Sequence, residues 1–230
     1  MIRNVPFTGV LILLSALLAF GQLAETQDTK IPWSMTVVVM DGADQVKQAE
    51  IPVKEAVAFI EAHTRFKFEV SYVVAPDDHG YTPYKTGTGR KTETRYAMMA
   101  WDVPKSVIDL LPTSTSYLFL YKLFGKKPAQ AGSALGLDFG IIKKRKPRPY
   151  ATVPVDMWWF VNTPKQGFKS WAAQVLTHEI INTIQAKLEA RPYLCGQLGA
   201  TPGTPANVYE SERLTKISDK CYAKLGNNAN

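Results

Sequence analysis

The residues with the clearest chemical potential are His178, Glu179 and Asn182, which stand in the order His-Glu-x-x-Asn. On a helix, a motif with His at both ends of this spacing places two imidazoles one turn apart, where both can reach a Zn²⁺ ion. A Glu beside the first His can take a proton from metal-bound water. Here Asn182 occupies the position of the second His. The motif predicts a hydrolytic zinc site that lacks one strong ligand, with Glu179 as its base.

The segment around this motif has the pattern of a long amphipathic helix, from about residue 170 to 189. Each helical residue advances by about 100°, which places His178 and Asn182 on one side, with Glu179 at its flank. The opposite side carries the aliphatic residues Leu176, Ile180, Ile181, Ile184 and Leu188. We therefore expect a helix that is buried through its aliphatic stripe and carries the motif on its polar stripe. A solvent-facing stripe is the simpler alternative, because every amphipathic helix has one.

Several other elements are expected to position this helix. Apolar or alternating runs predict strands at residues 35–40, 66–74, 116–123, 134–142 and 151–155. Apolar spacing predicts a helix from Pro52 to His63, where the His complements the helix dipole, and a short one at 103–111. The polar, glycine-rich segment 77–94 predicts an exposed loop, with His79 as a solvated residue.

With this order of elements, the motif resembles the zincin metallopeptidases, the family of zinc peptidases named for the His-Glu-x-x-His helix. His178 and Glu179 match that motif residue by residue, and Asn182 departs from it. The resemblance implies an α+β fold over residues 35 to about 222. That fold has a mixed, twisted sheet with a backing helix, a glycine-containing edge strand and a central active-site helix.

The resemblance also implies a further zinc ligand downstream of the helix. The candidates are Glu210 and Glu212 in the stretch 209–212, and Asp219 in the stretch 217–221. We prefer Asp219, because the nearby Cys221 could be joined by a disulfide to Cys195, close to the end of the helix. The expected metal site is therefore zinc held by His178, Asn182 and Asp219.

Two further segments are candidates for binding. Trp158 and Trp159 lie in the densest aromatic patch, which is either part of the core or the wall of a peptide-binding cleft. A basic run is either a solvated loop or a contact for a polyanion. Its members are Lys143, Lys144, Arg145, Lys146 and Arg148. The net charge of +7 is moderate and no nucleic-acid-binding motif is present, so we expect no nucleic acid partner.

The first 21 residues have the layout of a secretory signal peptide, with a positive start, an apolar run from Val10 to Phe20 and a small-x-small cleavage signal. A spanning helix needs roughly 20 apolar residues, so we expect no membrane span after cleavage. Residues 22–230 are expected to form a single secreted domain. The chain's two cysteines, Cys195 and Cys221, predict one disulfide, worth roughly 3–4 kcal/mol.

Two functions follow from these residues. The first is a secreted zinc-dependent peptidase with an altered ligand set. The alternative is a catalytically inactive protein of the same fold, which uses the cleft to bind a peptide, a glycan or a protein partner.

Overall fold

The fold is taken from a computed structural model that describes residues 30–40, 44–76, 78–86, 92–128, 133–135, 148–155, 168–189, 210–211, 214–215, 217, 219 and 222–223. The chain divides into two units, Met1–Lys30 and Ile31–Asn230, and the elements below belong to the second. Some predicted features lie outside the described residues and stay predictions. They are the signal peptide, the aromatic pair Trp158 and Trp159, the cysteines Cys195 and Cys221, and the basic run except Arg148.

The centre of the second unit is a five-stranded sheet with the strand order β2-β1-β5-β7-β6. Neighbouring strands among β2, β1, β5 and β7 run parallel, and β6 pairs with β7 in the antiparallel direction. The strands are β1 (Ile31–Val39), β2 (Phe66–Val74), β5 (Ser116–Tyr121), β6 (Ser133–Leu135) and β7 (Tyr150–Pro154). The protein is therefore of mixed α/β architecture, and the mixed sheet expected from the sequence is confirmed.

The central strands are buried on both faces, which explains their nearly continuous apolar sequences. All residues of β5 and β7 are buried. Along β5, Leu118 and Leu120 belong to one hydrophobic cluster, whereas Phe119 and Tyr121 belong to another. This alternation follows from the two-residue period of a strand. The sheet consequently has a core on each side.

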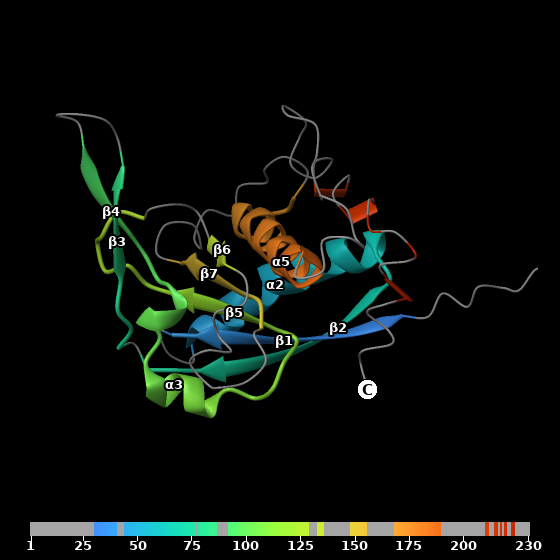
Figure 1. Cartoon of the computed structure of the whole chain (residues 1–230), viewed down its shortest axis with the longest axis horizontal. Helices are drawn as coiled ribbons and strands as arrows, with labels where there is room; N and C mark the ends of the chain where they lie inside the picture. The colour runs from blue at the N-terminus through green and yellow to red at the C-terminus, as the bar shows by residue number, and fades with distance from the viewer. Residues whose placement is uncertain are drawn as a thin grey trace, which may run out of the picture. The chain divides into compact units, whose positions relative to one another are not determined.

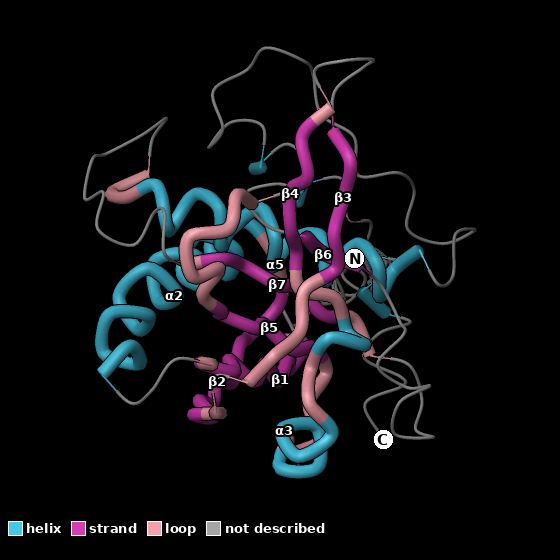
Figure 2. Tube along the Cα trace, turned by 90° about the vertical axis from the view of Figure 1, so that its left-hand side faces the viewer, coloured by secondary structure: helices cyan, strands magenta, loops and turns pink. Residues whose placement is uncertain are grey.

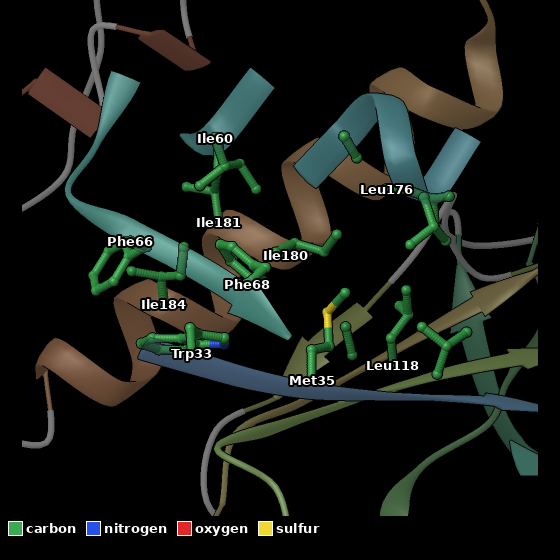
Figure 3. Packing of buried hydrophobic residues seen from close by; sticks show 14 of the residues in the cluster. Trp33, Met35, Ile60, Phe66, Phe68, Leu118, Leu176, Ile180, Ile181 and Ile184 are labelled. Carbon is green, nitrogen blue, oxygen red and sulfur yellow. The ribbon is translucent and has the colours of Figure 1, made fainter. Parts of the chain in front are cut away.

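Helices α2 (Asp44–His63) and α5 (Trp171–Glu189) pack against each other and lie on one side of the sheet (Figure 1). The buried stripe of α2 consists of Ala49, Val53, Ala56 and Ile60, at helical spacing. Its partner stripe on α5 includes Ile180, Ile181 and Ile184, which belong to the same hydrophobic cluster as Trp33 and Phe66 of the strands (Figure 3). Within the described ranges, neither helix is long and apolar enough to cross a membrane.

The second cluster lies between the other side of the sheet and the segment that follows strand β4 (Glu93–Ala97) (Figure 1). This segment contains the 3-10 helix η2 (Ala100–Asp102) and helix α3 (Lys105–Leu110). Val107 and Ile108 of α3 are buried in the same hydrophobic cluster as Val38 and Phe119. The short helix predicted at residues 103–111 is thus confirmed, and it covers the face of the sheet opposite α5.

The expected loop at residues 77–94 is wrong in part. Its second half enters a two-stranded antiparallel hairpin, β3 (Thr82–Thr86) and β4 (Glu93–Ala97), which rises away from the main sheet (Figure 2). The hairpin strands are polar and half-exposed, so the apolar signal of a strand is missing from the sequence. His79 is buried rather than solvated, because its ring packs edge-on against Tyr81 and Tyr121.

Helix α2 also begins earlier than expected and contains Pro52 in its interior. A proline there removes one backbone hydrogen bond, which favours a start at that residue. The preceding turns stay helical because Ala49 is fully buried in the core and packs with the rest of the stripe. At the other end His63 is the last residue, and its Nδ1 donates to the carbonyl of Phe59 at 2.7 Å. Helix α2 thus ends at His63, as the sequence predicts.

Candidate functional site

Helix α5 spans Trp171–Glu189, as its sequence pattern predicts. Ser170 caps its start, since the Ser170 hydroxyl accepts the backbone N–H of Ala173 at 3.1 Å. Thr177 and Thr183 are buried, and their hydroxyls donate to the carbonyls of Ala173 and Ile180. These bonds give each buried hydroxyl a hydrogen-bond acceptor within the helix. The motif is therefore carried by a helix that the core holds firmly.

His178 contacts a carboxylate from a distant part of the chain. Its Nδ1 lies 2.6 Å from Oε1 of Glu210, 32 positions later. The His178 side chain is 44% exposed, whereas that of Glu210 is only 3% exposed. A buried carboxylate needs a donor or a positive charge nearby, because burial without one is costly. The imidazole of His178 supplies that donor.

This contact determines which ring nitrogen of His178 carries the proton. An ionised carboxylate only accepts hydrogen bonds, so Nδ1 carries the proton in the bond to Glu210. In a neutral imidazole the lone pair then lies on Nε2, the other ring nitrogen. Metal-binding histidines are commonly oriented by a carboxylate in this way. The pair is thus suited to present Nε2 of His178 to a metal ion or a proton.

Glu179 and Asn182 form the second contact of the motif. The amide Nδ2 of Asn182 donates to Oε2 of Glu179 at 3.3 Å. Glu179 is 4% exposed, more buried than its place at the flank of the polar stripe suggests. Asn182, in the position of the missing His, therefore orients the carboxylate that would act as the base. Its carbonyl oxygen is the atom with which Asn can ligate a metal.

Glu210 is held in place by the packing of the C-terminal segment. Leu214, Ile217 and Tyr222 of this segment are buried in the same hydrophobic cluster as α2 and α5. The ring of Tyr222 contacts that of Phe66 edge-on, with the centroids 5.5 Å apart. The segment therefore docks on the core through side chains, and this docking brings Glu210 to His178.

Asp219, the preferred carboxylate in the sequence analysis, is placed differently. Its carboxylate pairs with Arg65 at 2.7 Å, and its side chain is 84% exposed. Helical periodicity carries a signal that distinguishes the two acids. At about 100° per residue, Glu210 falls within about 40° of Leu214 on a helix. Leu214 is buried in the core, so this spacing favours an inward direction for Glu210, whereas Asp219 follows Ile217, which is not helical.

The donors suit zinc only in part. Within the described ranges, no group of three or more His, Cys, Asp or Glu side chains could hold a metal ion. His178 offers imidazole, which zinc prefers, and Asn182 offers a weak amide oxygen. These two residues can begin a zinc site. Further ligands would have to be water or residues outside the described part.

A short strand of the main sheet lies beside the helix that carries the motif. Among the strands that the structure describes, β6 is the outermost on its side of the sheet, and it packs against α5. The edge strand predicted at residues 134–142 is thus present at Ser133–Leu135, and its remainder lies outside the described residues. An edge strand and the motif helix therefore lie side by side.

Comparison with models of known protein families gives no match, and comparison with curated proteins gives none either.

Proposed function

We propose that this protein is a secreted, zincin-like zinc-dependent peptidase with an altered ligand set. The observation that carries this proposal is the contact between His178 and the buried carboxylate of Glu210. His178 lies on the same helix as Glu179, whose carboxylate accepts a hydrogen bond from Asn182. A solvated polar stripe has no need of a buried carboxylate from a remote segment. The arrangement of the edge strand β6 beside α5 supports the same proposal.

In this proposal His178 would hold zinc through Nε2, and Asn182 would be a weak ligand through its carbonyl oxygen. Glu210 replaces Asp219 as the relevant carboxylate, and it acts by orienting His178. Zinc would supply Lewis acidity and a water of lowered pKa. Glu179 accepts the proton of the attacking water and later gives it to the departing amine. Asn182 keeps the Glu179 carboxylate in position through Oε2.

A peptide is the proposed substrate because an edge strand is a template for an extended chain. Edge strands pair with added strands through their outer N–H and C=O groups. A peptide bound along β6 would lie next to α5, since these two elements are in contact. That helix carries Glu179, the proposed general base.

The test combines zinc content and cleavage. The mature protein is dialysed with zinc and analysed by metal mass spectrometry, and cleavage is followed with a broad peptide library. We expect zinc in the wild type and in Glu179→Gln, but not in His178→Ala. Cleavage should fall at least about 100-fold in Glu179→Gln, the usual effect of removing a general base.

Asp219→Asn is the matched control, because it removes a carboxylate of the same segment that pairs with Arg65 instead of His178. It should keep both zinc and activity. Wild-type protein without zinc at excess metal, or cleavage that is unchanged in Glu179→Gln, would reject the peptidase. Absence of both zinc and cleavage would favour the alternative, a non-catalytic protein that binds a peptide, a glycan or a partner protein.

A further inference from the structure

A second candidate site lies on the opposite side of the sheet from α5, around η2 and the start of α3. It is a pocket of about 580 Å³, and Trp101, Asp78, Asp102 and Ile108 contribute to its lining. Ile108 is buried and belongs to the second hydrophobic cluster. We propose that this pocket binds the side chain of an arginine residue in a peptide or protein partner.

The first support is the state of Trp101. Trp101 is 60% exposed, slightly more than Phe124, which is 56% exposed. Its indole Nε1–H is nevertheless fixed, since it donates to the hydroxyl of Thr82 at 2.8 Å. The ring is therefore held in one orientation with its surface left in contact with solvent. A single exposed apolar residue needs no explanation, but a fixed aromatic ring beside a pocket is a ready stacking surface.

The hydrogen bond to Thr82 belongs to a longer chain of interactions. The Thr82 hydroxyl donates in turn to Oδ2 of Asp102 at 2.8 Å, and the backbone N–H of Met99 donates to the same oxygen at 2.8 Å. The carbonyl of Asp102 accepts the N–H of Gly80 at 2.8 Å. Trp101 and Asp102 are thus held in position by hydrogen bonds to Thr82 and Gly80, which come from an earlier segment of the chain. Preorganisation of this kind reduces the entropy that a ligand must overcome on binding.

The second support is the charge of the pocket. The Asp102 carboxylate accepts bonds from neutral donors only, and Asp78 has no ion pair within the described part of the chain. Lys105, which also lines the pocket, is paired with Asp109. The pocket therefore presents two carboxylates that no described cation neutralises, in a chain whose net charge is +7. A cationic ligand complements this local charge.

An arginine side chain can use both the exposed ring of Trp101 and the two carboxylates. Tryptophan is the best aromatic partner for a cation above its ring. A guanidinium group is planar, so it can stack on an indole while its N–H groups reach carboxylates at its edge. Lysine would offer the charge without the planar stacking. The site goes beyond the proposed peptidase activity, and its test does not depend on that activity.

The probe is a blocked amino acid, N-acetyl-arginine methylamide, and the control probe is its citrulline counterpart, which has the same shape without the charge. The readout is the indole N–H resonance of Trp101 in a ¹⁵N spectrum of the full protein, assigned with Trp101→Phe. We expect this resonance to shift in a saturable manner with the arginine probe. The citrulline probe should bind at least about tenfold more weakly, a difference of about 1.4 kcal/mol.

Asp78→Asn should weaken the arginine probe several-fold, and it is a mild change because Asp78 is exposed. Glu69→Gln is the matched control, since it removes the same charge from an exposed position on β2 and should leave binding unchanged. Trp101→Leu should abolish binding when the probe itself is observed by saturation transfer. No shift at Trp101, an equal shift with citrulline, or no effect of Asp78→Asn would overturn the proposal. A shift with methyl glucoside in place of arginine would also overturn it, in favour of a carbohydrate site.

Discussion

Nδ1 of His178 and Oε1 of Glu210 lie 2.6 Å apart, although the two residues are 32 positions apart in the chain. The donor comes from the motif helix α5, and the acceptor comes from a C-terminal segment that docks on the core through Leu214 and Ile217. The contact therefore couples the chemistry of the motif to the packing of that segment.

Removal of the Glu210 carboxylate should destabilise the protein. Glu210→Ala leaves the imidazole of His178 without its buried acceptor, and it should lower the free energy of unfolding by about 2–3 kcal/mol, as for bonds to charged groups. Asp219→Ala removes an exposed ion pair and should cost less than about 1 kcal/mol. Urea unfolding followed by circular dichroism measures both. Equal losses in the two variants would contradict the assignment of Glu210 as the inward carboxylate.

Loss of the same carboxylate should also weaken metal binding. An acceptor that orients a metal-binding His typically contributes 10- to 100-fold in metal affinity. We therefore expect Glu210→Gln to raise the zinc dissociation constant by about this factor, while Asp219→Asn leaves it unchanged. Competition with a chromophoric chelator gives the two constants. The prediction applies to the folded protein, so each variant is first checked for a native unfolding midpoint.

Restoration of the second imidazole should strengthen the site. Asn182→His would place two imidazoles one turn apart on α5, the arrangement that zinc favours. We expect zinc to bind at least about tenfold more tightly, a gain of about 1.4 kcal/mol. Chelator competition again provides the measurement. Unchanged zinc affinity in Asn182→His would mean that the polar stripe of α5 does not face a metal position.

The aliphatic stripe of α5 should dominate the stability of the unit. Ile180 is fully buried between α5 and the sheet, so Ile180→Ala should lower the free energy of unfolding by about 2–5 kcal/mol through the lost contacts and the cavity. Ile51 of α2 is 74% exposed, and Ile51→Ala should change it by less than about 0.5 kcal/mol. Both values come from urea unfolding. A small effect at Ile180 would argue against the packing of α5 on the sheet.

Tyr72 should titrate at a higher pH than an exposed tyrosine, and its ionisation should lower the stability of the protein at alkaline pH. Burial and, to a lesser extent, the nearby Glu50 carboxylate together raise the pKa of Tyr72 from its ordinary value of 10.0 to about 12. The folded state thus keeps a proton that the unfolded state loses. The stabilising contribution is complete below pH 10 and disappears as the pH rises from 10 to 12.

The difference in absorbance at 295 nm between the wild type and Tyr72→Phe reports this titration directly. The loss of stability between pH 10 and 12 should be smaller in Tyr72→Phe. Glu50→Gln should move the pKa of Tyr72 part of the way down, because Glu50 is the lesser of the two causes. A midpoint near 10 in the wild type would contradict the burial of this ring.

Much of the framework could be predicted because its signals are local. The stripe of Ile180, Ile181 and Ile184 follows from the helical period, and the structure buries all three. The β-branched run of β1 and the apolar run of β5 likewise predict strands that the structure contains. The hairpin β3–β4 was not predicted, because its strands are largely polar. They are held together by backbone hydrogen bonds, which leave no apolar pattern in the sequence.

The sequence by itself determined the helix that carries His178, Glu179 and Asn182, and it determined which side of that helix is apolar. These properties depend on residue types at fixed spacing, which act within a few residues of one another. Only the tertiary structure decided that β7 lies inside the sheet, that His79 is buried between two tyrosines, and that Glu210 rather than Asp219 reaches His178. Each of these outcomes depends on which distant segments share a core, and that is set by packing over the whole unit.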